Sequence, residues 1–168
     1  MKFSKIALIG FMGSGKSSVG AALATLLAMR FVDLDSLVLQ RSGYLSISEI
    51  FKALGEHEFR RLESEVALSL SDATQLVIAT GGGIIGRHQN IEALKNSGGV
   101  CVLLHVSFPE ALRRALEVSD RPLLHDLSAA EKLFIARQPV YQEYADLSVQ
   151  TDGKTVKQIC SEILSHLS

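Results

Sequence analysis

The sequence predicts an α/β fold in which helices cover both faces of a parallel β-sheet. Short apolar runs, several rich in β-branched residues, alternate with segments of helical periodicity along the whole chain. Such alternation produces βαβ units. The chain has 168 residues without repeats or linker-like segments, so we expect one domain over residues 1–168. Because ligands of such sheets bind beyond the carboxyl ends of the strands, functional residues should follow strands.

The expected elements follow one another in a regular order. The first strand, residues 5–10, leads through a glycine-rich turn into a helix that begins at about Lys16, with Val19 and Leu23 on one side. Gly98 and Gly99 end a later helix, because glycine is favoured just past a helix end. The other expected strands cover 30–35, 75–80, 100–106 and 146–151, and the other helices cover 46–72, 87–97, 108–118, 128–145 and the segment from about Lys154.

Composition and charge exclude several classes of function. The net charge of −1 predicts no broad surface for nucleic acid or for an acidic membrane. No apolar run approaches the roughly 20 residues of a membrane-spanning helix, and no signal-peptide cleavage pattern follows the first lysines. The two cysteines, Cys101 and Cys160, have neither metal-binding nor redox spacing. We therefore expect a cytoplasmic monomer without nucleic-acid or membrane partners.

A phosphate-binding motif follows the first strand. Residues 10–18 read GFMGSGKSS, which contains the complete P-loop pattern G-x-x-x-x-G-K-S. Its glycines let backbone N–H groups point at phosphate oxygens, and the next helix directs its positive end to the same place. Lys16 can reach the β- and γ-phosphates, and the Ser17 hydroxyl can bind Mg²⁺. A plain glycine-rich turn is the alternative, but this full spacing between strand and helix favours nucleotide binding. The predicted nucleotide-binding residues here are Gly13, Ser14, Gly15, Lys16, Ser17 and Ser18.

The magnesium ion of a P-loop protein also needs a carboxylate, and the sequence offers Asp33 and Asp35. Motor ATPases and switch GTPases place this carboxylate after an apolar strand, but neither the third nor the fourth expected strand supplies one, and the guanine-reading motif N-K-x-D is absent. Residues two apart in a strand face the same way. We therefore expect one aspartate to help hold Mg²⁺ and the other to bind an acceptor hydroxyl. The alternative is a polar strand exit in which Asp35 caps the next helix.

Two arginines are candidate anchors for a small-molecule acceptor. Arg60 borders the inward side of its helix, with Glu63 three residues on and placed to orient the guanidinium. Taken alone, Arg60 would more often be an exposed helix arginine. Arg137 falls at an inward position of its helix, although Pro139 disturbs the periodicity. A charge on an inward face is more often paired or functional than not.

Two further segments suggest a ligand site. Gly81, Gly82 and Gly83 follow the third strand, and consecutive glycines suit a close approach of the backbone to a ligand. The segment EVSDRPLLHDL lies between two helices and suits a lid from which Arg121 could reach the transferring phosphate. A plain loop and an inert surface loop are the respective alternatives.

Together these residues resemble the shikimate kinase family. The resemblance covers nearly the whole chain, in order through GFMGSGKSSVG, FVDLD, IFKALGEHEFRRLE, IATGGGII, DRPLL and RQPVYQEYAD. It implies a three-layer P-loop kinase fold of the nucleoside-monophosphate-kinase type with a five-stranded parallel sheet. It also implies a helical substrate-binding section over about 33–62 and a mobile lid over about 118–128. In that family ATP phosphorylates the 3-hydroxyl of shikimate, giving shikimate 3-phosphate and ADP, on the route to chorismate and the aromatic amino acids.

The resemblance implies a role for each matched residue. Arg60 and Arg137 clamp the shikimate carboxylate, while Asp35 binds the hydroxyls and either accepts the proton or only orients the group. The expected catalytic residues are Lys16, Asp35 and Arg121, the last as a lid arginine on the phosphates, and the expected Mg²⁺ ligands are Ser17 and Asp33. The complete expected acceptor site is Asp35, Phe51, Phe59, Arg60, Glu63, Gly81, Gly82, Gly83 and Arg137.

The adenine contacts depart from the family pattern. Members often carry a proline near the last strand–helix junction, where this sequence has Asp152, Gly153 and Lys154. We therefore assign adenine contacts to Lys154 and to Arg113 or the neighbouring Arg114. A gluconate-type or nucleoside-monophosphate kinase is the alternative enzyme, and a non-catalytic nucleotide sensor is an alternative of another class.

Overall fold

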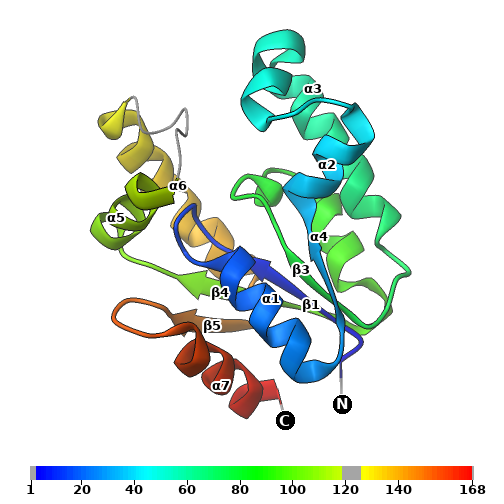
Figure 1. Ribbon diagram of the computed structural model, residues 1–168, viewed down its shortest axis with the longest axis vertical. Coiled ribbons are helices and arrows are strands. Elements are labelled where there is room, and N and C mark those ends of the chain that lie inside the picture. The colour runs from blue at the N-terminus through cyan, green and yellow to red at the C-terminus, as the bar shows by residue number, and fades with distance from the viewer. Residues whose placement is uncertain (1–2, 119–125, 168) are drawn as a thin grey trace.

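The computed structural model describes residues 3–118 and 126–167 and contains one sheet of five parallel strands in the order β2-β3-β1-β4-β5 (Figure 1). The strands are β1 (Lys5–Ile9), β2 (Arg30–Asp33), β3 (Leu76–Ala79), β4 (Gly99–His105) and β5 (Leu147–Gln150). In register, Ile6 of β1 pairs with Val77 of β3 on one side and with Val100 of β4 on the other. The loop after β1 therefore leaves the centre of the sheet, where the strand order reverses and ligands of such sheets bind.

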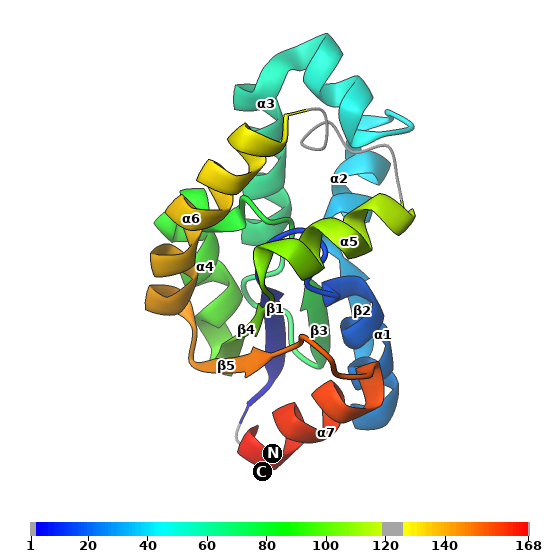
Figure 2. The same cartoon turned by 90° about the vertical axis from the view of Figure 1, so that its left-hand side faces the viewer.

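Helices cover both faces of the sheet and also extend beyond its carboxyl edge. The helices are α1 (Lys16–Leu27), α2 (Leu34–Ser42), α3 (Ile47–Ser69), α4 (His88–Lys95), α5 (Phe108–Val118), α6 (Leu127–Tyr144) and α7 (Val156–Leu167), with short 3₁₀ turns η1 (Ile84–Gly86) and η2 (Asn96–Gly98). Figure 2 shows α4 and α6 on one side of the strands and α1 on the other. Among the described helices, none combines the length and the apolar composition that a membrane span requires.

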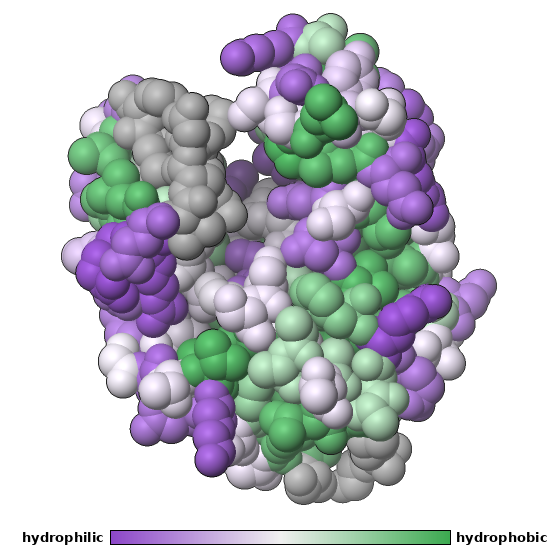
Figure 3. Space-filling model, in the orientation of Figure 1, coloured by the Kyte–Doolittle hydropathy of each residue, from purple (hydrophilic) through white to green (hydrophobic). Residues whose placement is uncertain are grey.

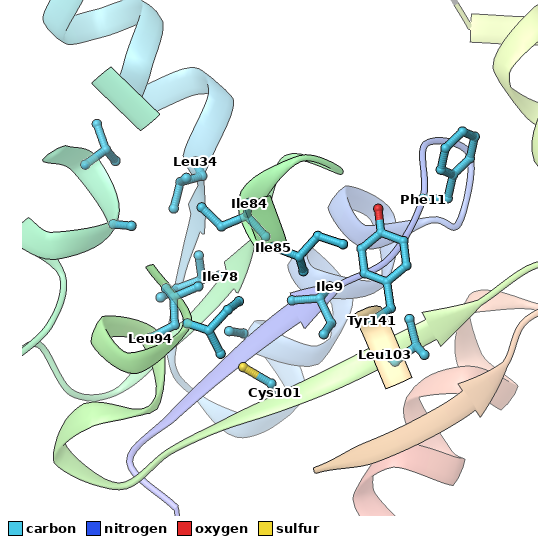
Figure 4. Close-up of a cluster of buried hydrophobic side chains, with 14 of the residues drawn as sticks. Ile9, Phe11, Leu34, Ile78, Ile84, Ile85, Leu94, Cys101, Leu103 and Tyr141 are labelled. Carbon is cyan, nitrogen blue, oxygen red and sulfur yellow. The ribbon is translucent and has the colours of Figure 1, made fainter. Parts of the chain in front are cut away.

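The hydrophobic core has two parts, one on each face of the sheet. One part packs Leu8, Val102 and other inner residues of the strands against α1 and α7. The other packs Ile9, Ile78 and Leu103 against α3, α4 and α6 (Figure 4). Parallel strands buried on both faces are expected to read as continuous apolar runs, which is how β1, β3 and β4 appear in the sequence. The expected three-layer fold is present.

The second strand is shorter than the sequence predicted, and a helix follows it at once. β2 ends at Asp33, which caps α2 by accepting a 3.0 Å hydrogen bond from the Ser36 N–H. Asp35 therefore lies in the first turn of α2 and not in the strand, so the expectation that strand pleating aligns the two aspartates was wrong. The alternative prediction, that Asp35 caps this helix, was also wrong, because the cap is Asp33, two residues earlier. Leu34 and Val38 are fully buried, and this spacing of four was the missed helical signal.

Helix boundaries elsewhere agree with the sequence to within a few residues. α3 contains a kink at Gly55, whose φ of 81° and ψ of 169° are not helical, so the residues from Glu56 to Ser69 form a separate helical segment. α6 runs continuously from Leu127 to Tyr144 with Pro139 inside it. The final helix starts at Val156, two residues later than expected.

Lys5 is a charged side chain inside the core. It is fully buried, and its ammonium donates hydrogen bonds to the carbonyls of Leu70 at 2.9 Å, Ser71 at 2.8 Å and Ala93 at 3.3 Å. These carbonyls lie at the carboxyl ends of α3 and α4, where a cation is favoured by the helix dipoles. Burial lowers the pKa of Lys5. Lys5 thus joins two helices to the start of β1.

Candidate active site

The loop after β1 has the backbone of a phosphate-binding loop. Gly10, Gly13 and Gly15 all have positive φ, at 144°, 74° and 92°, which is the region that favours glycine. Gly15 precedes α1 and provides no side-chain cap for its first N–H groups. The ammonium of Lys16 donates 2.8 Å hydrogen bonds to the carbonyls of Gly10 and Phe11 and also lies 3.3 Å from the buried Ser14 hydroxyl. The predicted cradle is therefore formed, with Ser17 and Ser18 exposed on the first turn of α1.

The two predicted metal ligands lie together. The Ser17 hydroxyl donates a 2.9 Å hydrogen bond to Oδ2 of Asp33, whose other oxygen caps α2. A hydroxyl and a carboxylate beside a P-loop are hard oxygen ligands, which suit Mg²⁺ held together with nucleotide phosphates. In the part of the chain that the structure describes, no group of three or more histidine, cysteine or carboxylate side chains is arranged to hold a metal ion. These residues therefore fit a nucleotide-bound Mg²⁺ and not an all-protein metal cage.

The glycines after β3 make room for the acidic and basic side chains of the site. A β-carbon on Gly81 would lie 2.7 Å from Oε1 of Glu63 and 3.0 Å from Oδ1 of Asp35, and one on Gly83 would lie within 2.4 Å of the Arg60 guanidinium. Neither glycine has a positive φ, so the backbone itself does not require glycine here. From the sequence, we predicted that the backbone of these glycines approaches a ligand closely. The structure shows in addition that the loop approaches these three side chains.

Gly82 lies against the last predicted anchor. A β-carbon there would lie 3.4 Å from both Nη1 of Arg137 and the hydroxyl of Tyr141. Tyr141 is buried in the core, and its hydroxyl donates a 2.5 Å hydrogen bond to the Gly82 carbonyl (Figure 4). Burial raises the pKa of Tyr141 to about 12, so the phenol stays neutral and remains a donor. Only its position one helical turn after Arg137 could have indicated from the sequence that Tyr141 lies at this site.

Glu63 holds Arg60 in place from inside the protein. The Glu63 side chain is 1% exposed, and its Oε2 accepts a 2.8 Å hydrogen bond from Nη1 of Arg60. Burial raises the pKa of Glu63, while Arg60 opposes that shift. Arg60 also lies 3.4 Å from the exposed Glu56. The prediction that Glu63 orients Arg60 is consistent with this geometry, which leaves the Arg60 side chain 23% exposed.

The two predicted aromatic residues form one wall beside Arg60. The guanidinium lies 5.0 Å from the ring centre of Phe59, which is in turn 4.8 Å from the ring centre of Phe51. An arginine over an aromatic face gains a modest cation–π attraction. Both residues belong to α3; Phe59 is buried in the core and the half-buried Phe51 packs against it.

A cavity of about 500 Å³ opens where these elements meet, between α3, the η1 turn, the start of α4, and α6. Its walls include Arg60, Glu63 and Arg137, as predicted, together with Asn90 and a third arginine, Arg87. The sequence interpretation missed Arg87. The rule that functional residues follow strands could have found it, because it comes shortly after β3 and the triple glycine.

The arginines of α5 differ in direction. Arg113 faces outward and forms ion pairs with Glu110 at 2.8 Å and Glu117 at 2.6 Å. The surface over α5 is hydrophilic (Figure 3). Arg114 faces inward and donates to the carbonyls of Gly13 at 3.3 Å and Thr151 at 3.0 Å. Of the two candidate arginines, Arg114 and not Arg113 therefore contacts both the P-loop and the loop after β5.

The other predicted nucleotide contacts are less well placed or lie outside the structure. Lys154 forms an ion pair with Glu162 of α7. Arg121 and residues 119–125 of the predicted lid lie outside the described residues. At the end of that segment, Asp126 caps α6 by accepting a 2.9 Å hydrogen bond from the Ala129 N–H.

Fold and site together define a P-loop kinase fold of the nucleoside-monophosphate-kinase type with an acid- and arginine-lined pocket. Comparison with known proteins narrows this class. A family model for shikimate kinase matches residues 12–168. A shikimate kinase of Geobacter metallireducens is 42% identical over 164 residues, which cover 96% of this chain and 90% of that protein.

Solved structures agree. The shikimate kinase of Acinetobacter baumannii, solved in complex with shikimate, superposes with a TM-score of 0.91 at 34% identity, covering 98% of this chain and 93% of that one. The shikimate kinase of Aquifex aeolicus superposes with a TM-score of 0.85 at 40% identity, covering 97% of this chain and 95% of that one. The chain belongs to the shikimate kinase family, which confirms the resemblance and the fold predicted from the sequence.

Proposed function

We propose that this protein transfers the γ-phosphate of ATP to the 3-hydroxyl of shikimate, giving shikimate 3-phosphate and ADP. Membership of the family supports the activity. The observation that carries it in this chain is the meeting of Asp35, Glu63 and Arg60 around Gly81 and Gly83. A carboxylate for hydroxyls and a rigidly held guanidinium for an acid match the two ends of a polyhydroxylated cyclic acid.

The nucleotide binds at the cradle in this proposal. The Lys16 ammonium exchanges its carbonyl partners in the loop for the β- and γ-phosphates, and the N–H groups at the start of α1 face the same oxygens. Ser17 and Asp33 would hold Mg²⁺, which neutralises charge on the phosphates when bound. Arg114 lies beside the P-loop and is the better placed arginine for the nucleotide side. Arg121 would close over the phosphates from the lid.

The acceptor binds against the triple-glycine loop. Arg60 and Arg137 hold its carboxylate, and Asp35 accepts a hydrogen bond from the reacting hydroxyl and so turns that oxygen toward the γ-phosphorus. The new bond joins this oxygen to the γ-phosphorus while the bond from that phosphorus to the β–γ bridging oxygen breaks, and the hydroxyl proton passes to Asp35 or, where Asp35 only orients the group, to solvent. Phosphoryl transfer requires mainly positioning and charge neutralisation. No activated nucleophile is therefore needed from this chain.

An acceptor panel tests the proposal. ADP release is measured in a coupled assay with ATP, Mg²⁺ and either shikimate, gluconate or a nucleoside monophosphate, with no acceptor as the control. We expect kcat/KM to be highest with shikimate by at least about 100-fold, because only this acceptor satisfies both ends of the pocket. Faster turnover with gluconate or a mononucleotide would replace the assignment. ATP binding without transfer to any acceptor would favour a nucleotide sensor.

The remaining expectations belong to the same proposal. We infer a monomer that acts in the cytoplasm on two small molecules, ATP and shikimate, without nucleic-acid or membrane partners. The near-neutral net charge of −1 supports the absence of a broad polyanion surface. One domain over 1–168, with an acceptor section over about 33–62, is consistent with a pocket built from α3, η1, α4 and α6 and with Asp35 of α2 beside the triple-glycine loop.

A further inference from the structure

Arg87 stands at a position that directs it into the acceptor cavity. It follows η1 and precedes the first turn of α4, with an extended backbone (φ −135°, ψ 117°). Its half-buried side chain lines the same cavity as Arg60 and Arg137. Nη1 of Arg87 donates a 3.2 Å hydrogen bond to the Ser64 hydroxyl, which in turn donates to the Arg60 carbonyl at 2.9 Å. Arg87 is thereby fixed against α3 within one turn of Arg60.

The charges that line the cavity do not balance. Its lining includes three guanidiniums and two carboxylates, those of Glu56 and Glu63, and both carboxylates pair with Arg60. Within residues 3–118 and 126–167, neither Arg87 nor Arg137 has a carboxylate at ion-pair distance, and the Ser64 hydroxyl that bonds Arg87 is neutral. Glu63 also attracts Arg137 electrostatically, but not as an ion pair. The protein therefore compensates these two half-buried guanidiniums only in part, which leaves the rest to solvent or to an anion.

We infer that Arg87 is a third cationic determinant of acceptor binding, which attracts the carboxylate held by Arg60 and Arg137 and thereby selects anionic acceptors. The inference rests on the proposed function. Arg87 acts as a positioning residue through its charge and does not touch the reacting atoms. A guanidinium suits this role, because it is weakly hydrated and always charged. At an effective dielectric constant of about 20, one charge acting over roughly 8–12 Å changes binding by about 10-fold to 30-fold.

The test compares Arg87→Met and Arg87→Lys with Arg41→Met. Arg41 is a matched control, because it also donates to an α3 serine hydroxyl, Ser69 at 2.7 Å, but it is exposed and lines no part of the cavity. We expect Arg87→Met to raise the KM for shikimate about 10-fold, with kcat and the KM for ATP within about twofold of wild type. Arg87→Lys should restore most of the affinity, and Arg41→Met should leave all three constants unchanged.

Salt separates a charge effect from a packing effect. Added KCl should raise the KM for shikimate less steeply in Arg87→Met than in wild type, since one contributing charge is gone. Arg87→Gln, which removes the charge but keeps a hydrogen-bond donor, is the second variant if Arg87→Met fails a thermal-unfolding check.

Unchanged shikimate KM in Arg87→Met or Arg87→Gln overturns the inference, as does an equal loss in Arg87→Lys. A wild-type protein that does not phosphorylate shikimate at all overturns the proposed function instead.

Discussion

The substitution Gly83→Ala tests whether the triple-glycine loop sets the position of Arg60. The added β-carbon would lie 2.3 Å from Nη1 of Arg60, whereas ordinary contact begins at 3.4 Å, so the guanidinium must move by about 1 Å. The obstacle is the end of a flexible side chain, and Gly83 has a φ of −94° that alanine can adopt. The fold should therefore tolerate the change while the acceptor site does not.

The expected loss follows from the hydrogen bond that the displaced guanidinium can no longer make. A charge-assisted bond to a carboxylate contributes about 1.5–3 kcal/mol, which corresponds to a rise of about 10-fold to 150-fold in the KM for shikimate. The coupled ADP-release assay measures this, with the KM for ATP as an internal reference. Gly86→Ala is the control: this exposed glycine also lines the cavity, but no atom lies within 4 Å of an added β-carbon, so the change displaces no side chain.

Two results would refute this reasoning. An unchanged shikimate KM in Gly83→Ala would mean that Arg60 has another productive position. A thermal midpoint lower than that of wild type by more than about 10 °C would mean that the loop cannot absorb the methyl group, contrary to the expected small change. Gly86→Ala should match wild type in both measurements.

Three other predictions test the remaining parts of the molecule. In the coupled assay, Arg137→Ala should raise the KM for shikimate about 10-fold to 100-fold and leave ATP affinity intact. Lys16→Ala should instead weaken ATP binding and lower kcat at least about 100-fold. Equal losses of affinity for both ligands in both variants would indicate unfolding. Lys5→Met should lower the free energy of unfolding in urea by about 2–4 kcal/mol, because three buried carbonyls lose their donor, and an unchanged midpoint would contradict this. Burial raises the pKa of Glu63 in the folded state above its usual 4.5, so the stability linked to its protonation is fully present below pH 4.5 and is lost as the pH rises through the folded pKa. Over that pH window, the free energy of unfolding of wild type should therefore fall relative to that of Glu63→Gln. Parallel curves of stability against pH for the two proteins would contradict this.

Local spacing explains which features the sequence could predict. The P-loop works through backbone N–H groups of consecutive residues, so its pattern contains nearly all of its geometry, and Gly10, Gly13 and Gly15 adopt the positive φ that the pattern requires. The parallel sheet follows from alternation, and the carboxyl ends of β1, β2 and β3 bring Lys16, Asp33 and the triple glycine to one edge.

Predictions from the sequence were incomplete or wrong for features that depend on contacts between residues distant in the chain. Asp35 was predicted to lie in a strand with Asp33 but lies in α2, because a four-residue strand followed at once by a helix has the pattern of one longer strand. Arg113 and Arg114 are adjacent, and only the packing of α5 on the P-loop decides which one faces inward. Arg87 and the burial of Lys5 depend on segments that meet only in the folded chain.

The charge distribution of the pocket explains how one scaffold can discriminate between acceptors. Arg60 is already compensated by Glu63, so it acts as a rigid, pre-oriented donor at little cost of reorganisation. Arg87 and Arg137 have no carboxylate of the described chain within ion-pair distance, so a bound carboxylate gains from both. A neutral polyol could still bond to Asp35, but it would not supply these two guanidiniums with the counter-charge of a bound acid after displacing water. In the proposed function, Asp35 therefore positions the reacting hydroxyl, while the arginine side of the pocket selects an anionic acceptor.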